Sequence, residues 1–470
     1  MKTRQFLFLL TSLATPLAAQ VTSAPVLGPA PALTLPKVER DSLSNGLQVV
    51  VSRNAEVPLM SAQLLIFGGA RLAGSASGMA SFAGDMLDEG ANGRNTFQLA
   101  DELDFLGARL GTGAGWENFT ISLSGPKRTF GQAMSLMADV LLKPTFAAVD
   151  VKRVRDLRLT ALLASRDNPG TVAQRVFFRN VFPAGHPYHD AITGDSTTLT
   201  SFDSAAVRNF WSRAANPEQA TLVVTGDVTL PEAMALAKSH FGSWRTPSKP
   251  MVRPAPDKVA PAPRTPTRVI LVDKPNAAQS VIYVGGPGIA RSAPDYPATQ
   301  LMMTILGGSF SSRLNDILRE QRGYSYGANA GFSWSPVIGP FLASSAVRTD
   351  ATDSSLAIFI REFETIRTQP VSATELNRAK AYIVLGSLGD YETPSQVSGA
   401  LATSLLFGRP LSTIAAEMRA TDRLTVADVQ RAARAHLDPA LLTIVVVGDL
   451  AKIRPGIERL KLGPVSVQTY

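Results

Sequence analysis

VVTGD at residues 223–227 and VVVGD at residues 445–449 each end a hydrophobic stretch, and these two stretches decide the fold. Their aspartates lie 222 residues apart (449 − 227). Earlier in each half, a predicted strand ends in a glycine pair, Gly68-Gly69 or Gly285-Gly286, and the second glycines lie 217 residues apart (286 − 69). Matches in the same order at nearly constant spacing predict a duplicated domain of about 200 residues.

Predicted strands and helices are mixed within each half. In the first half, residues 48–51, 61–67 and 115–124 favour strands, whereas residues 77–89, 96–107, 127–141 and 147–166 show helical periodicity. Thr96 is the expected cap of the second helix, where Phe97, Ala100, Leu103 and Leu106 share one face. We therefore expect an α+β fold with two homologous domains, each a mainly antiparallel sheet with helices packed on one face.

Seven prolines lie within residues 247–266 and predict an extended, semi-rigid linker, because proline at this density neither pairs in a central strand nor continues a helix. The predicted domains are residues 38–246 and 267–470. Residues 1–19 are typical of a secretory signal, with Lys2 and Arg4 before a short apolar core. Residues 20–37 form an Ala- and Pro-rich lead-in. We expect an exported, periplasmic protein without a membrane-spanning segment after the signal.

Composition excludes several kinds of chemistry. The 470 residues contain no cysteine, which rules out disulfides, cysteine metal sites and thiolate catalysis. Only four histidines occur, the first at His186, and no glutamate lies between Glu117 and Glu218. The formal charge of +8 is spread along the chain, so no nucleic-acid partner is expected.

Several stretches resemble the pitrilysin/insulinase family of zinc metallopeptidases. They are SNGLQVVV at 44–51, FGGARLAG at 67–74, GMASFAGDMLDEGA at 78–91, HPYHDAITGD at 186–195 and DKPNAAQSVIYVGGPG at 273–288. LGGSFSSRLNDILREQRGYSYG at 306–327 is the most specific of them. The resemblance runs from residue 43 to about residue 455 and implies two domains that form one half of a clamshell.

The family's catalytic segment is His-x-x-Glu-His on a helix, where two imidazoles bind zinc and the glutamate acts as general base. The matching residues here are Ser81, Gly84 and Asp85, and Ala161 stands at the family's third ligand position. The resemblance therefore implies no catalytic zinc site and no cofactor in this chain.

Other metal sites are also disfavoured by the sequence. His186 and His189 form the only local histidine pair, which matches a loop of the family where packing is the expected role. Asp85, Asp88 and Glu89 form either a solvated acidic face or a weak cation site. His240 and His436 are isolated and are expected to be surface or packed residues.

Arg319 and Tyr326 match an Arg/Tyr pair that, in family members, reaches the active site and hydrogen-bonds substrate carbonyls and the tetrahedral oxyanion. The structural alternative is that Arg319 pairs with a local carboxylate such as Asp316 and that Tyr326 fills a core. Arg313, in the preceding turn, is expected to be structural.

The favoured hypothesis is a noncatalytic, substrate-positioning subunit of a heterodimeric zinc metalloendopeptidase, inactive alone. Its partners would be a homologous exported subunit that carries the zinc and a peptide substrate. Two alternatives stay open: a non-enzymatic peptide-binding or structural envelope protein on the same fold, and a stand-alone hydrolase with unusual ligands.

Overall fold

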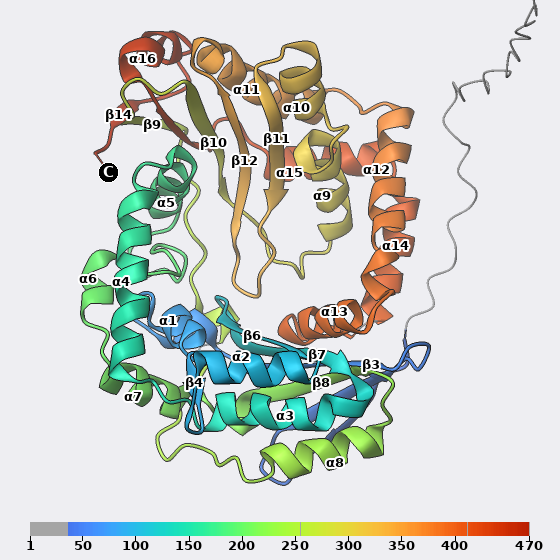
Figure 1. Ribbon diagram of the computed structural model, residues 1–470. Coiled ribbons are helices and arrows are strands. Elements are labelled where there is room, and N and C mark those ends of the chain that lie inside the picture. The colour runs from blue at the N-terminus through green and yellow to red at the C-terminus, as the bar shows by residue number, and fades with distance from the viewer. Residues whose placement is uncertain (1–35, 254, 411, 470) are drawn as a thin grey trace, which may run out of the picture. The chain divides into compact units, whose positions relative to one another are not determined.

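The repeated hydrophobic strands form two six-stranded sheets in the computed structural model, which describes residues 36–253, 255–410 and 412–469 (Figure 1). The predicted signal and nearly all of the lead-in lie outside the described residues. No helix among the described residues is long and apolar enough to cross a membrane.

The first sheet has the order β1-β2-β8-β3-β7-β6, and only β2 and β8 pair in parallel. All seven residues of β8 are buried, which indicates a strand covered on both faces. The strands are β1 (Glu39–Ser42), β2 (Gln48–Arg53), β3 (Leu59–Phe67), β6 (Arg109–Ala114), β7 (Asn118–Pro126) and β8 (Ala220–Gly226), and β4 (Gly90–Ala91) and β5 (Arg94–Asn95) form a separate small hairpin.

The second sheet has the order β11-β12-β10-β13-β9-β14, in which β9 pairs in parallel with both β13 and β14. Five strands repeat the first sheet's order, with β9, β13, β10, β12 and β11 in the places of β2, β8, β3, β7 and β6. The two chain halves are therefore duplicates, as expected. The strands are β9 (Arg268–Asp273), β10 (Gln279–Pro287), β11 (Ser325–Phe332), β12 (Pro340–Arg348), β13 (Thr443–Gly448) and β14 (Val465–Val467).

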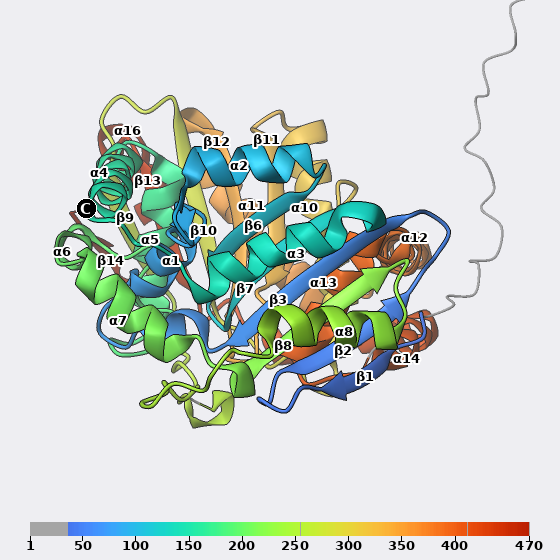
Figure 2. The ribbon, with the colours of Figure 1, turned by 60° about the horizontal axis from the view of Figure 1, so that its bottom comes forward.

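Helices of each half cover one face of that half's own sheet. In the first half, α1, α3 and α8 contact strands, and Figure 2 shows α3 and α8 in front of them. Phe82, Phe119 and Phe130 lie in the fully buried core of this layer. The helices are α1 (Met79–Asp85), α2 (Thr96–Phe105), α3 (Lys127–Leu142), α4 (Ala148–Ser165), α5 (Pro169–Val181), α6 (Ser196–Thr200), α7 (Ser204–Ala214) and α8 (Leu230–Phe241).

The second half repeats this layer with α9, α11 and α16 against its sheet. Its core contains Phe359 and Phe363 from α11. The helices are α9 (Tyr296–Met303), α10 (Arg313–Asn315), α11 (Thr352–Thr368), α12 (Ala373–Gly386), α13 (Pro394–Leu406), α14 (Ser412–Arg423), α15 (Val426–His436) and α16 (Leu450–Arg459).

The two halves exchange one helix each. Helix α5 of the first half packs on β10 and β13 of the second sheet, where Phe177 meets Val445 and Val447. Helix α13 of the second half packs on β3 and β8 of the first sheet, where Leu401 meets Val223. The expectation of helices on one face is therefore incomplete, because the opposite face of each sheet is covered by the other half's helix (Figure 1).

The sequence also determines where both exchanged helices begin. Asn168 accepts a hydrogen bond from the backbone N–H of Thr171, and Pro169 follows at the first helical position of α5. Thr393 and Gln396 form a capping box at the start of α13, again with proline next. Strand β10 continues past the glycine pair to Pro287. A residue with a side chain does not fit at Gly285, because a Cβ there would lie 2.0 Å from the Phe341 carbonyl oxygen and 3.0 Å from the Phe177 ring.

Two local predictions are wrong, and one strand was not predicted. The cap of α2 is Asn95, which forms a capping box with Gln98, and not Thr96. The buried face of α2 contains Leu99 and Leu103, whereas Phe97 is exposed. Strand β6 was not expected, because its sequence RLGTGA has two glycines and no apolar alternation.

The proline-rich segment 247–266 is docked in part rather than free. The N–H of Met251 donates to the carbonyl of Arg213, and Arg253 forms an ion pair with the buried Glu117. Further along, Ala262 is buried in the cluster that α5 forms with the second sheet. Packing thus holds parts of this segment against both halves, which proline content alone does not predict.

Candidate functional site

Ser81, Gly84 and Asp85 lie on α1, a short helix whose residues Met79–Gly84 are all buried. The Ser81 hydroxyl donates to the carbonyl of Ile192 at 2.8 Å. Asp85, at the end of the helix, is the only one of the three with a carboxylate. Serine and a single carboxylate are a poor ligand set for zinc, which prefers imidazole and thiolate together with carboxylates.

A guanidinium stands against the two positions that correspond to metal ligands. Arg158 of α4 donates from Nη1 to Ser81 Oγ at 3.1 Å and from Nη2 to Asp85 Oδ2 at 2.5 Å. Nη2 also lies 2.9 Å from the Ser81 carbonyl oxygen, and the group sits 5.2 Å from the Phe82 ring centroid. A tethered cation therefore satisfies the oxygens that would otherwise face a metal.

Gly84 allows no side chain at the position of the general base. A Cβ there would lie 2.8 Å from the Gly113 carbonyl carbon and 2.9 Å from the Ala114 nitrogen, both in the backbone of β6. Because backbone cannot move aside as a flexible side chain can, a glutamate at this position would require β6 to shift. Ala161, one turn after Arg158 on α4, is exposed and has no ligating atom.

The remaining carboxylates near α1 are also engaged. Glu89 forms an ion pair with Arg153 of α4 and accepts from the Thr96 hydroxyl at 2.8 Å. Burial raises the pKa of Asp88, and the neighbouring Glu89 and Asp85 also act in this direction. Among the described residues, no group of three or more His, Asp or Glu side chains could hold a metal ion. The residues of this site therefore do not fit the family's zinc.

The His186–His189 segment packs rather than forming a ligand pair. The His186 ring stacks on Phe182 at 4.4 Å between centroids, and its Nδ1 accepts from the backbone N–H of Tyr188. Burial, followed by the nearby His189, lowers the pKa of His186 to about 4. The Tyr188 hydroxyl lies 2.6 Å from Ser335 Oγ, so this loop joins the two halves.

The two isolated histidines are held within the fold. His436 Nε2 lies 2.5 Å from Asp295 Oδ2, and burial lowers the pKa of His240 on α8. Neither belongs to a group of side chains that could hold a metal ion among the described residues.

Arg319 and Tyr326 are both accessible. Arg319 lies in the π-helical turn η5 (Asp316–Gln321), and its guanidinium stacks over Phe310 at 4.4 Å. Its ion pair is with Glu320 at 3.4 Å, whereas Asp316 accepts from Gln321 instead. Arg319 therefore does pair with a local carboxylate, as the structural alternative predicts, although the partner is Glu320 and not Asp316.

Tyr326 is 91% exposed and follows Ser325 at the start of β11, where the pairing register with β12 shifts before Ala328. It does not fill a core, so this part of the structural alternative is wrong. Tyr324, two residues earlier, packs against the second half's core. No hydrogen bond joins Arg319 to Tyr326 among the described residues, so they are two separate donors on one surface segment.

Arg313 has the structural role expected of it. Its guanidinium binds both oxygens of Glu375 on α12, at 2.6 and 3.2 Å. Burial alone would raise the pKa of Glu375, but the hydrogen bonds from Arg313 and from Ser372 lower it to about 2. This pair fixes the segment that precedes Arg319.

Sequence reasoning missed two residues of the site, Arg158 and Phe310. Arg158 is one of three arginines on α4 and lies 77 residues after Ser81 (158 − 81), so no local pattern connects them. Phe310 lies in the segment GGSF and is 68% exposed. An exposed phenylalanine beside a glycine pair is a weak signal that only the stacked arginine makes meaningful.

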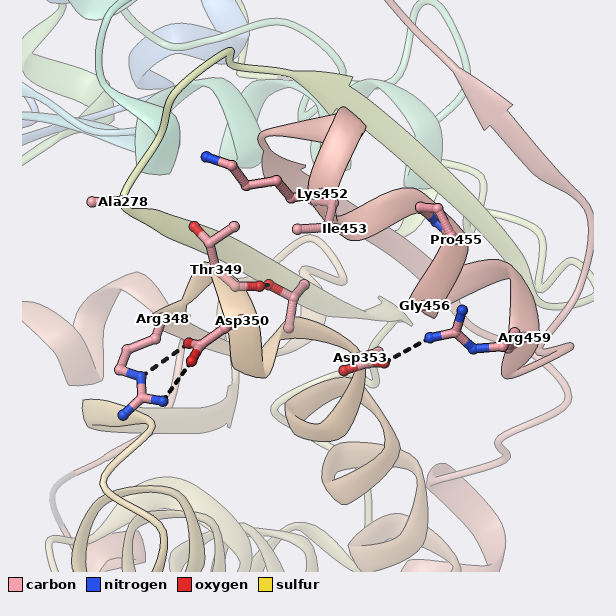
Figure 3. A pocket seen from close by; sticks show the side chains of 11 residues that line it. Ala278, Arg348, Thr349, Asp350, Asp353, Lys452, Ile453, Pro455, Gly456 and Arg459 are labelled. Atoms are coloured by element: carbon pink, nitrogen blue, oxygen red, sulfur yellow. Dashed lines mark hydrogen bonds and ion pairs between the residues drawn. The ribbon is translucent and has the colours of Figure 1, made fainter.

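A cavity of about 740 Å³ lies elsewhere, between the start of α11 and α16 (Figure 3). Its cations are paired with carboxylates already: Arg348 with Asp350, Arg459 with Asp353, and Lys452 with Asp449. The cavity therefore offers no free charge for a ligand, and we do not include it in the candidate site.

Comparison with known proteins places this geometry in context. Residues 48–183 match the family description "Insulinase (Peptidase family M16)", and residues 201–383 match "Peptidase M16 inactive domain". A Mycobacterium tuberculosis protein described as an uncharacterised zinc protease is 26% identical over 400 residues, which are 85% of this chain and 90% of that protein. The Helicobacter pylori protein described as non-peptidase homolog YmxG is 20% identical over 86% of this chain and 92% of its own length.

Solved structures show the same fold. The peptidase M16 inactive domain from Pseudomonas fluorescens matches with a TM-score of 0.80 and 26% identity, over 88% of this chain and 98% of that chain. A protease from Helicobacter pylori matches with a TM-score of 0.80 and 19% identity, over 88% and 100% of the two chains. At the lower identity, this second likeness concerns the fold alone.

Proposed function

Because the chain belongs to the insulinase family of peptidases as a noncatalytic member, we propose that it positions peptide substrates for a homologous subunit that carries the catalytic zinc. The observation that carries this proposal is a contrast between two places. At the site on α1, Arg158 and the backbone of β6 fill the space for metal and base. In the second half, Tyr326 is an exposed donor without a hydrogen bond among the described residues, and Arg319 is an accessible donor whose ion pair is with the exposed Glu320.

The proposed chemistry is binding and orientation. A guanidinium offers charged, planar donors, and a phenol offers a neutral donor. Both suit the carbonyl oxygens of an extended peptide and the oxyanion that forms when one carbonyl is attacked. Phe310 fixes the plane of the Arg319 guanidinium by stacking and leaves its edge available. The water-activating groups would come from the partner subunit.

Export belongs to the same proposal. Residues 1–19 have the basic start and apolar core of a secretory signal, so we place the complex in the periplasm. The first test is co-purification from the envelope fraction, with zinc analysis and a peptidase assay on the same eluate. We expect a zinc-bearing homologous partner and activity only in the mixed complex.

Site variants test the positioning role in that complex. Removal of one oxyanion donor typically lowers turnover about 10²–10³-fold, so Arg319→Ala and Tyr326→Phe should each do so without loss of assembly. Arg322→Ala and Tyr382→Phe are matched controls, because both side chains are exposed and outside the stacked group. Full activity in both site variants would refute the positioning role.

A non-enzymatic function is the second candidate, and the description of the Helicobacter pylori relative as a non-peptidase favours it. In that case the chain would use the same fold to bind peptides or to take part in an envelope complex, without a role in catalysis. A zinc-free, inactive assembly without a homologous partner, recovered under the conditions above, would favour this candidate over the split enzyme.

A further inference from the structure

Helix α2 carries two exposed phenylalanines on one stripe. Phe97 is 80% exposed and Phe105 is 91% exposed, and they lie eight residues apart with Asp101 midway. Positions i, i+4 and i+8 of a helix share a face. The Asn95–Gln98 capping box fixes the start of the helix, and Leu99 and Leu103 are buried on the opposite side. The two rings therefore cannot turn into the core without unwinding α2.

A groove runs beside this stripe, between α2 and α3, which lie side by side in Figures 1 and 2. Its volume is about 360 Å³. Leu106 and Leu136 are buried residues of its lining, Phe105 forms one wall, and Gln132 and Ser135 of α3 contribute polar groups. An apolar groove beside exposed aromatic rings is typical of a surface that receives an apolar side chain of a partner.

Acidic side chains surround the groove, and two of their carboxylates have no partner among the described residues. Glu102 pairs with Arg94 at 2.8 Å, and Arg94 also pairs with Asp139. Asp101 and Asp104 are exposed, and their carboxylates make no hydrogen bond or ion pair with any described residue. Two free carboxylates beside two phenyl rings repel anionic lipid and nucleic acid and attract lysine or arginine.

We propose that the α2–α3 groove, with Phe97 and Phe105 beside it, binds a cationic amphipathic helix of another protein. Apolar side chains of that helix would pack against the two phenyl rings and enter the groove. Its basic side chains would lie over Asp101 and Asp104. This surface belongs to different elements from Arg319 and Tyr326, so the inference does not depend on the proposed function.

The test uses the full mature chain and a fluorescein-labelled 14-residue helix of leucine and lysine at amphipathic spacing. Fluorescence anisotropy measures its affinity at low and high salt, next to the same peptide with glutamate in place of lysine. We expect the lysine peptide to bind at least about tenfold more tightly than the glutamate peptide, with affinity that falls as salt rises.

Variants assign the binding to this surface. Phe97→Ser with Phe105→Ser, and separately Asp101→Asn with Asp104→Asn, should each weaken the lysine peptide at least about tenfold. Val149→Ser with Leu163→Ser removes two other exposed apolar groups, from α4, and should leave the affinity unchanged. Because all these side chains are exposed, circular dichroism should show unchanged melting.

Three results would overturn the proposal. The lysine peptide does not bind, or it binds equally well to the groove variants, or the occupant is a second copy of this chain. The last is recognised by light scattering, as a dimer that becomes a monomer in the Phe97→Ser, Phe105→Ser variant.

Discussion

Arg158 does at residues 81 and 85 what a bound cation would do. It brings a positive charge to Asp85 and donates to two oxygens of Ser81, and its side chain is mostly buried. Unlike a metal, it is tethered, so the positive charge comes from α4 and joins that helix to α1. The identities of Ser81, Gly84 and Asp85 predicted a degenerate site, but the residue that fills it could be found only in the folded chain, because three arginines of α4 compete for that role.

Replacement of Arg158 by glutamine should destabilise the protein. Loss of the buried guanidinium leaves the oxygens of Ser81 and Asp85 with fewer hydrogen-bond donors. A buried acceptor without a donor typically lowers the free energy of unfolding by about 1–3 kcal/mol. Since Asp85 is half exposed, we expect the lower part of this range in urea denaturation. Lys152→Ala on the same helix removes an exposed pair with Asp156 and should change the free energy of unfolding by less than about 0.5 kcal/mol. Equal stability of the two variants would contradict a structural role for Arg158.

His186 makes stability depend on pH. Burial, and then the nearby His189, lowers its pKa from 6.5 to about 4 in the folded chain. Below pH 6.5 the unfolded chain binds a proton that the folded chain does not, so this contribution to stability is complete above pH 6.5 and is lost as pH falls toward 4. Thermal melting at pH 7.5, 6 and 5 should show a smaller loss for His186→Asn than for the parent. Parallel losses would show that other groups determine the acid sensitivity.

At the scale of elements, the closeness of α1 to β6 decides whether the site could hold a base. Both elements are glycine-rich at the contact: Gly84 faces Gly113 with no room for a Cβ. The sequence predicted α1, α3 and α4 from their apolar periodicity, although α1 ends at Asp85 rather than at residue 89. It did not predict β6, because an edge strand held by backbone pairing leaves little trace in its side chains.

Gly84→Ala tests this contact with the smallest possible change. A methyl group 2.8 Å from backbone atoms must displace α1 or β6, and overpacking of this kind costs about 1–3 kcal/mol. Gly113→Ala on β6 is the control, because a Cβ at that position meets nothing within 4 Å. Gly93 also has free space around it, but its positive φ would strain an alanine there. We expect Gly113→Ala to unfold at nearly the parental urea concentration and Gly84→Ala at a lower one. A fully stable Gly84→Ala would reopen the question of a glutamate at this position.

At the scale of the whole molecule, the exchanged helices connect the two halves. The repeat of motifs predicted two similar domains, because each VVxGD strand stands at the same place in its sheet. The exchange itself could not be predicted, since the buried faces of α5 and α13 do not reveal which sheet they cover. Phe177 and Leu401 are fully buried only because each lies on the other half's sheet.

Separation of the halves should therefore expose both surfaces. Residues 36–246 alone would present the apolar face of α5 to water and leave the outer face of β3 and β8 uncovered, and residues 267–470 would do the same with α13, β10 and β13. Large exposed apolar faces of this kind lead to association or incomplete folding. We expect each half to be insoluble or to bind a hydrophobic dye when produced alone, and the two to be recovered as a folded complex when produced together. Phe177→Ala should weaken that complex, because it leaves a cavity at the exchanged helix that costs about 3–5 kcal/mol. Two halves that are separately soluble, melt cooperatively and do not associate would contradict the exchange as a source of stability.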